Sequence, residues 1–262
     1  MKTGNIPLYY EIHGKGYPLL LISGLNSDNA SWAGVCGKLA KYFRVIMFDN
    51  RGSGRSDVPR KKYSVREMAA DTIGLLDHLQ IKKCHIIGHS MGGYIAQELA
   101  IHYPERVGKL LLEATAPVSS ARNNLLFNDF LKRFEKDRDH QALMRLWACW
   151  LFSPKTFERK NYIATFIKKS SAYPYFQSAQ GFKGQIEAVT AFNASAAIKK
   201  IKAKTLVMIG NDDILVRPEE SMRLVRGIKG SVFVSIKDTG HCAHVENPDI
   251  FISKVRQFLK AS

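Results

Sequence analysis

The sequence predicts an α/β fold, in which helices flank a doubly wound, mostly parallel sheet and a helical cap is inserted. Short apolar runs, typical of strands buried on both faces, alternate along the chain with segments of helical periodicity. A glycine-rich turn at residues 88–93 joins one of these runs to a helix-like segment. Residues 119–194 interrupt the alternation, because they contain helical patterns and no convincing buried strand.

The first half of the chain follows the order strand, helix, strand. Residues 6–13 alternate loosely and predict an edge strand, and a helix-like segment covers residues 32–42. Ser64 and Glu67 form a capping box, which begins a helix with apolar residues at helical spacing up to Leu79. The buried runs are residues 19–22, 45–48, 84–87 and 110–112. This order calls for a parallel, doubly wound sheet.

The second half resumes the alternation after the insertion. Residues 205–209 and 232–236 predict the last strands, and Asn247 with Pro248 resembles the start of a terminal helix. We therefore expect a core of residues 1–118 and 195–262 and a cap of residues 119–194, lying over the carboxyl edge of the sheet. We expect the cap as a whole to line a substrate pocket, although any single aromatic residue in it is expected to pack between helices. The aromatic residues in question include Phe127, Phe130, Phe134, Trp147 and Trp150.

Composition limits the classes of function. The formal charge is +16, but the basic residues are dispersed and accompany no nucleic-acid-binding motif, so we favour a basic solvated surface over a polyanion site. No apolar segment follows Lys2, and no run of about 18 apolar residues occurs, so we expect a cytoplasmic protein without a transmembrane segment. The scattered cysteines show no metal spacing and are expected to be reduced: Cys36, Cys84, Cys149 and Cys242.

Two glycine-rich stretches have different interpretations. Residues 49–56 lack the spacing of a phosphate-binding loop, so we interpret them as a tight turn pinned by Asp49 and Arg51. Residues 88–93 have the G-x-S-x-G pattern between a strand and a helix, which is typical of a nucleophile elbow. Such a turn raises Ser90 above the carboxyl edge of the sheet, at the positive end of a helix.

A serine nucleophile needs a histidine base, and the base needs a carboxylate that holds its tautomer. Both partners should follow strands at the same edge of the sheet as the serine. Ser90, Asp213 and His241 meet these conditions and occur in the order Ser, acid, His.

The chain resembles the α/β-hydrolase superfamily along essentially its whole length, most of all its small capped serine esterases, lactonases and C–C hydrolases. The resemblance is carried by residues 88–93, by residues 49–56, by residues 210–213 with Pro218, and by residues 240–241 with Glu246 and Pro248. The Asp-Asn-Arg-Gly form at residues 49–52 and the Ser-Gly-Leu loop at residues 23–25 are similar to enol-lactonase-like members.

The resemblance also implies roles for single residues. The family's acid stands three residues after a glycine and three before a valine, which favours Asp213, between Gly210 and Val216, over Asp212. The family's oxyanion donors are backbone N–H groups, here those of Met91 and Leu25.

Other histidines are weaker candidates. His244 forms an H-x-x-H pair with His241, but no third ligand is apparent, so no metal and no cofactor are expected. His89 is expected to be structural or to line the pocket.

The sequence favours hydrolysis of a small-molecule carboxylic ester, thioester or lactone through an acyl-enzyme. A C–C bond hydrolase with the same triad and a slow-turnover ligand-binding protein on this fold stay open as alternatives. The sequence does not indicate the oligomeric state.

Overall fold

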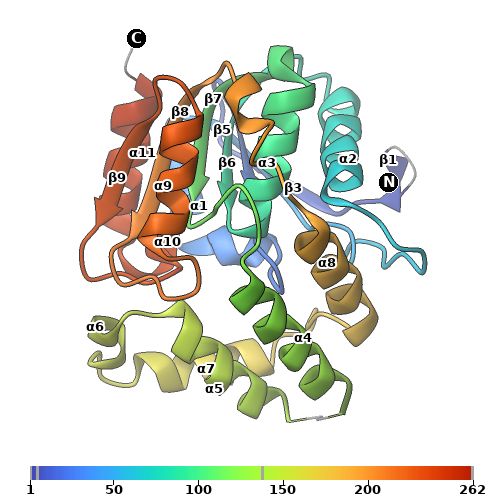
Figure 1. Ribbon diagram of the computed structural model, residues 1–262, viewed down its shortest axis with the longest axis vertical. Helices are drawn as coiled ribbons and strands as arrows, with labels where there is room; N and C mark the ends of the chain where they lie inside the picture. The colour runs from blue at the N-terminus through green and yellow to red at the C-terminus, as the bar shows by residue number, and fades with distance from the viewer. Residues whose placement is uncertain (1, 4–5, 137–138, 261–262) are drawn as a thin grey trace.

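A seven-stranded sheet forms the centre of the computed structural model, which describes residues 2–3, 6–136 and 139–260 (Figure 1). Its strands lie in the order β3-β5-β4-β6-β7-β8-β9, and every neighbouring pair is parallel except β3 with β5. They are β3 (Tyr10–His13), β4 (Pro18–Ile22), β5 (Arg44–Phe48), β6 (Cys84–His89), β7 (Val107–Glu113), β8 (Lys204–Gly210) and β9 (Val232–Ile236). The predicted fold class is confirmed.

The single edge strand predicted at residues 6–13 is wrong in detail. The structure divides it into β2 (Ile6–Pro7), which pairs with β1 (Lys2–Thr3) in a separate small sheet, and the edge strand β3. Between the two strands the backbone bonds to the loop at residues 49–57 instead of to a strand. The Tyr9 N–H donates to Ser56 Oγ (2.9 Å), and the Tyr9 carbonyl accepts from the Asp49 N–H (3.0 Å).

Helices cover both faces of the sheet. One face is covered by α2 (Val65–His78), α3 (Met91–His102) and α9 (Pro218–Gly227), and the other by α1 (Ala33–Leu39) and α11 (Pro248–Lys260) (Figure 1). Alternate residues of each central strand enter separate apolar clusters, as in β4, where Leu20 and Ile22 face α2 and α3 while Leu19 and Leu21 face α1 and α11. The capping box of α2 is confirmed, with Ser64 and Glu67 bonded reciprocally.

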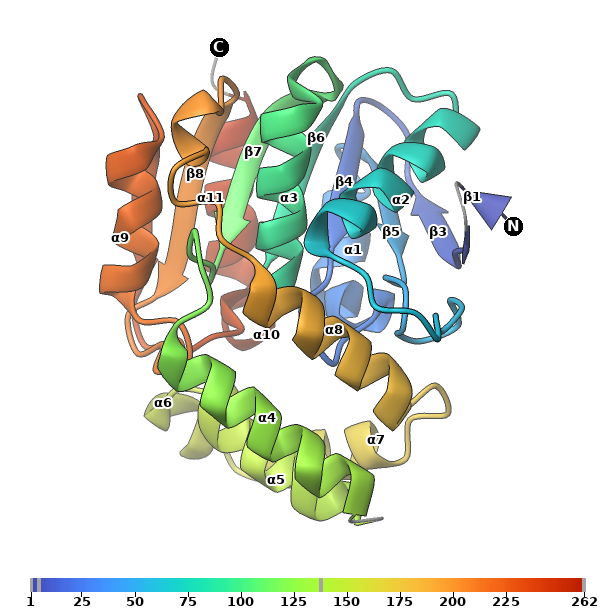
Figure 2. The ribbon, with the colours of Figure 1, turned by 45° about the vertical axis from the view of Figure 1, so that its right-hand side comes forward.

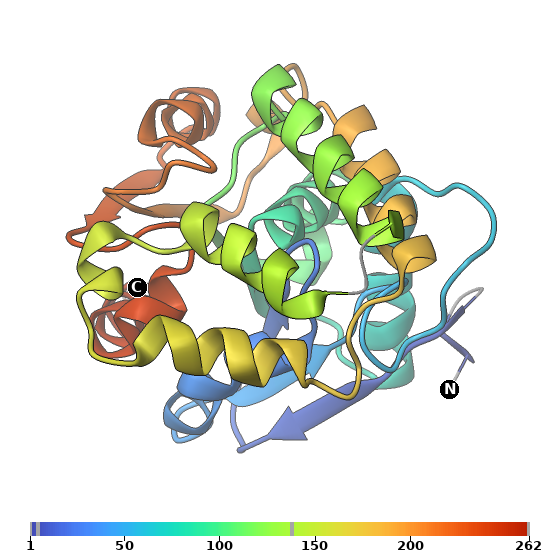
Figure 3. The ribbon, with the colours of Figure 1, turned by 90° about the horizontal axis from the view of Figure 1, so that it is seen from below.

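A helical insertion separates β7 from β8 and lies at the carboxyl ends of the strands (Figures 1 and 2). It consists of α4 (Ala121–Lys136), α5 (His140–Leu151), α6 (Pro154–Phe157), α7 (Tyr162–Ser171) and α8 (Ala179–Ala191). Seen from below, α4, α5, α7 and α8 surround the region in front of these strand ends (Figure 3).

Buried glutamine amides attach the insertion to the loop at residues 49–56. Gln177 Nε2 donates to the Gly52 carbonyl (2.7 Å), and Gln185 Nε2 donates to Ser53 Oγ (2.7 Å). This side of the insertion is therefore fixed to the sheet. No helix in the described ranges combines the length and apolarity needed to cross a bilayer.

Candidate active site

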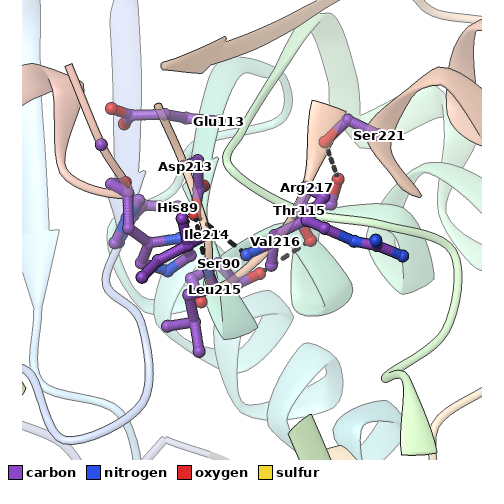
Figure 4. Close-up of polar contacts among 12 residues, drawn as sticks. His89, Ser90, Glu113, Thr115, Asp213, Ile214, Leu215, Val216, Arg217 and Ser221 are labelled. Atoms are coloured by element: carbon purple, nitrogen blue, oxygen red, sulfur yellow. Dashed lines mark hydrogen bonds and ion pairs between the residues drawn. The ribbon is translucent and has the colours of Figure 1, made fainter. Parts of the chain in front are cut away.

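Ser90 stands at a strained turn between β6 and α3. Its backbone has φ 54° and ψ −117°, a conformation that costs a non-glycine residue free energy and persists only where the surroundings enforce it. The Ser90 N–H donates to the Glu113 carbonyl (2.9 Å), and Thr115 Oγ donates to the Ser90 carbonyl (2.9 Å; Figure 4). Thr115 is held in turn by Ser221 Oγ, which donates to its carbonyl (2.7 Å). These bonds from β7 and α9 enforce the turn.

The glycines around Ser90 allow a close approach of backbone segments. A Cβ at Gly92 would overlap the carbonyl oxygen of Ile22 at the end of β4, and a Cβ at Gly88 would overlap the carbonyl oxygen of Gly92. The first turn of α3 can therefore lie directly against β4 and β6 only because these residues lack side chains. The expected nucleophile elbow has the backbone shape that its sequence pattern requires.

The structure brings Asp213 and His241 together. Asp213 Oδ2 lies 2.9 Å from His241 Nδ1, and both side chains are buried. Asp213 Oδ1 accepts from the N–H groups of Leu215 and Val216, both at 2.9 Å, so the carboxylate cannot rotate away (Figure 4). Asp212 has no side-chain hydrogen bond or ion pair within the described part of the chain. Asp213, which the family pattern favours over Asp212, is thus the carboxylate that contacts the His241 ring.

Ser90 and His241 line one cavity of about 650 Å³ beneath the helical insertion. In the described chain no hydrogen bond joins Ser90 Oγ to the His241 ring, as is common in unliganded sites of this kind. The insertion contributes a largely aromatic wall: Phe127, Trp147, Tyr162, Phe166, Tyr173 and Phe176. By contrast, Phe130 stacks on Trp147 with ring centroids 4.3 Å apart, and Phe134 packs on Phe182. The insertion's aromatic residues therefore divide between lining the cavity and packing the helices.

The loop after β4 lies against Ser90. A Cβ at Gly24 would stand 3.2 Å from Ser90 Cβ, and the neighbouring Leu25 lines the cavity. Met91 is the first residue of α3, so its N–H has no acceptor within the helix. The two backbone donors that the sequence predicts as an oxyanion hole thus belong to segments that meet at Ser90.

Ser23 fixes the conformation of this loop. Its Oγ donates to the Asp28 carbonyl (2.8 Å) and accepts from Trp32 Nε1 (3.0 Å). Its carbonyl accepts from Asn50 Nδ2 (3.1 Å). Since all of these groups are buried, the loop is held without a ligand.

His89 contacts the backbone of His241. Its Nε2 lies 3.0 Å from the His241 carbonyl oxygen, which requires the tautomer with a proton on Nε2. Burial, followed by the neighbouring His244 and His241, holds the pKa of His89 well below its usual value. His89 is therefore a neutral donor that supports the loop of His241.

Three further residues near this loop were not predicted as site residues. Glu246 Oε1 accepts from the Gly240 N–H (2.7 Å), and its Oε2 accepts from the Ser153 N–H (2.8 Å), so one buried carboxylate joins the His241 loop to the helical insertion. Glu113 and His244 form a second buried acid–histidine pair. The available signals were the motif position of Glu246, the H-x-x-H pattern, and a glutamate ending an apolar strand.

Potential metal ligands do not cluster in the described ranges. No group of three or more His, Cys, Asp or Glu side chains there could hold a metal ion.

Comparison with known proteins agrees with this architecture. Residues 17–248 match the profile of the alpha/beta hydrolase fold family. The chain is 30% identical over 258 residues to the putative carbamate hydrolase RutD of Variovorax paradoxus, covering 97% of this chain and 96% of that protein. The corresponding protein of Azorhizobium caulinodans is 29% identical, with 95% and 93% covered.

Solved structures of hydrolases are similar as well. The enol-lactonase from Burkholderia xenovorans LB400 superposes with a TM-score of 0.89 at 26% identity, covering 98% of this chain and 97% of that one. A thermophilic esterase from Thermogutta terrifontis gives a TM-score of 0.87 at 28% identity, covering 97% and 93%. With the parallel sheet, the elbow at Ser90 and a profile match over most of its length, the chain belongs to the alpha/beta hydrolase fold family and is a hydrolase.

Proposed function

We propose that the protein is a serine hydrolase that cleaves a small carboxylic ester, thioester or lactone. In this proposal residues 1–118 and 195–262 form the hydrolase core, and residues 119–194 form a cap over the site. The observation that carries it is the pairing of buried His241 with Asp213 in a cavity that also contains Ser90 at a strained elbow.

The proposed reaction proceeds through an acyl-enzyme. Ser90 Oγ attacks the acyl carbon while His241 Nε2 takes its proton, and Asp213 holds the Nδ1–H tautomer and stabilises the imidazolium. The N–H groups of Leu25 and Met91 bind the oxyanion. His241 then protonates the leaving group, and a water activated by the same histidine releases the acid.

The cavity supports a substrate of modest size with an apolar part. Its volume of about 650 Å³ and its aromatic wall fit a compact molecule whose acyl or alcohol portion packs against rings. The similar proteins are named carbamate hydrolase, enol-lactonase and esterase, and each name refers to cleavage at an acyl carbon. An uncharged carbamate should therefore be tested as a substrate together with esters and lactones.

The proposal is tested by trapping the intermediate. The protein is mixed with p-nitrophenyl butyrate, quenched in acid within milliseconds to seconds, digested and analysed by mass spectrometry. We expect a butyryl group on the peptide that contains Ser90, and none in Ser90→Ala. An acyl group on another residue, or hydrolysis that persists in Ser90→Ala, would contradict the proposal.

A further inference from the structure

A polar layer lies beneath the proposed triad, on the face of the sheet covered by α1 and α11. Ile87 and Leu111 point into the apolar cluster of that face. Two residues further along the same strands, at the same register level, stand His89 and Glu113. Because strand residues alternate between faces, these two side chains continue the apolar rows into the site. Figure 4 shows the Glu113 carboxylate pointing away from Thr115.

Glu113 is held by His244 of α10 (Ala243–Glu246). Glu113 Oε1 lies 2.9 Å from His244 Nδ1 and accepts from the His244 backbone N–H (3.1 Å). Glu113 is fully buried and His244 is 2% exposed. The remaining side-chain atoms, Glu113 Oε2 and His244 Nε2, are buried without a hydrogen-bond partner in the described chain. A structural pair would normally have these atoms satisfied, so this pair calls for an explanation.

The pair reaches His241 through His89. The ring of His89 lies between the other two histidines, 4.8 Å from the His244 centroid and 4.9 Å from the His241 centroid. Trp32 packs on His244 with ring centroids 4.4 Å apart and also contacts the edge of His89 at 6.3 Å, so it restrains both rings. His89 donates in turn to the His241 carbonyl. The chain of contacts runs from β7 through α10 and β6 to the loop of His241.

The hydrogen bonds of this pair indicate its donor and its acceptor. Glu113 Oε1 accepts from the His244 backbone N–H and lies against His244 Nδ1, so we place a proton on Nδ1 and take Glu113 as the accepting carboxylate. The titratable groups that face this pair are His89 on β6, Cys242 directly before α10, Glu246 at the end of α10, and the Asp213–His241 pair.

We propose that Glu113 and His244 are positioning residues for the hydrolase reaction. His244 holds the ring of His89 so that its N–H stays on the His241 carbonyl, and the fixed negative charge of Glu113 favours the imidazolium form of His241 in the transition state. The inference rests on the proposed function, because it assigns His241 the role of base.

Glu113→Gln tests the charge, because the amide oxygen can still accept both bonds from His244. Removal of the buried negative charge of Glu113 makes the imidazolium form of His241 less favourable and lowers the pKa at which His241 loses its proton. His241 is then free to act as base at lower pH, but the transition state is less stabilised. We expect the acidic limb of the rate profile to move to lower pH by about half a unit to one unit, and the plateau rate to fall about tenfold.

His244→Asn tests the positioning. The asparagine amide can donate to Glu113 as Nδ1 does, but the ring that contacts Trp32 and His89 is lost. We expect the acidic limb to keep its pH and the plateau rate to fall about tenfold, with little change in KM. The matched control is Glu98→Gln, which removes the carboxylate of another glutamate–histidine contact, that with His102 on α3 (3.3 Å), and should leave both quantities unchanged.

The readout is the rate at which diisopropyl fluorophosphate labels Ser90 between pH 5 and 9, with p-nitrophenyl butyrate turnover beside it. This labelling needs the base but no physiological substrate. The inference would be wrong if the pH–rate profile of Glu113→Gln were identical to that of the wild type, or if folded His244→Asn kept the wild-type plateau rate. Either result would leave the proposed function intact. If wild-type Ser90 is not labelled at any pH, the proposed function fails and this inference fails with it.

Discussion

Replacing Asp213 by asparagine separates the catalytic role of its carboxylate from its structural role. Oδ1 accepts the N–H groups of Leu215 and Val216, while Oδ2 faces His241 Nδ1. An asparagine can keep its oxygen on the two backbone amides, which places its NH₂ group against His241. Two donors cannot face each other, so the imidazole must move its proton to Nε2, where it can no longer accept from Ser90.

The expected loss follows from this tautomer change. A triad whose histidine is held in the wrong tautomer loses about 10⁴ in kcat, or about 5 kcal/mol of transition-state stabilisation. Since both backbone bonds of Asp213 persist, the melting temperature should change by only a few degrees.

Steady-state hydrolysis of p-nitrophenyl butyrate measures the loss, and Asp212→Asn is the matched control. Within residues 2–3, 6–136 and 139–260, Asp212 has only its backbone N–H engaged, with the Thr239 carbonyl (3.0 Å), so its variant should keep kcat within about twofold. A larger loss in Asp212→Asn than in Asp213→Asn would refute the assignment of the acid.

Three further predictions follow from backbone contact, burial and exposure. Gly92→Ala places a Cβ on the carbonyl oxygen of Ile22, so the free energy of unfolding, measured by chemical denaturation, should fall by about 1–3 kcal/mol. In the control Gly37→Ala the added Cβ meets nothing within 4 Å, so this variant should not be destabilised. Burial, with two nearby lysines, lowers the pKa of His85 to about 4, so His85 contributes stability above pH 6.5 that is lost as the pH falls toward 4. Because the His85 ring is half-exposed, the free energy of unfolding should fall by about 1–2 kcal/mol over this pH range, and His85→Gln should lack this part of the pH dependence. In native protein a thiol reagent should modify Cys149 rapidly and the three other, buried cysteines slowly; equal rates would contradict the burial pattern.

The sharp turn at Ser90 and the alternation of strands and helices were predictable because their signals are local. Gly88 and Gly92 flank Ser90 within one turn, and the structure shows that both are required by contacts of that same turn. His241 could be ranked above the other histidines because a glycine and the last strand precede it directly.

The features that could not be predicted depend on contacts between segments that are distant in the sequence. Glu113 and His244 are 131 residues apart, and only the register of β6 with β7 places Glu113 beside His89. The aromatic residues of the insertion could not be divided into lining and packing, because that division depends on how α4 and α5 are tilted over the sheet. Helix α9 was not predicted, although its sequence has Pro218 at the start and glutamates in the first turn, both typical of a helix N-terminus.

The most direct test of the proposed chemistry is a series of p-nitrophenyl esters of increasing acyl length, hydrolysed by the wild type and by Ser90→Ala. We expect turnover by the wild type that falls once the acyl chain exceeds what a cavity of about 650 Å³ accommodates, and none above background in the folded variant. Equal turnover by the wild type and Ser90→Ala, or none by folded wild type with any ester, would contradict an esterase mechanism centred on Ser90.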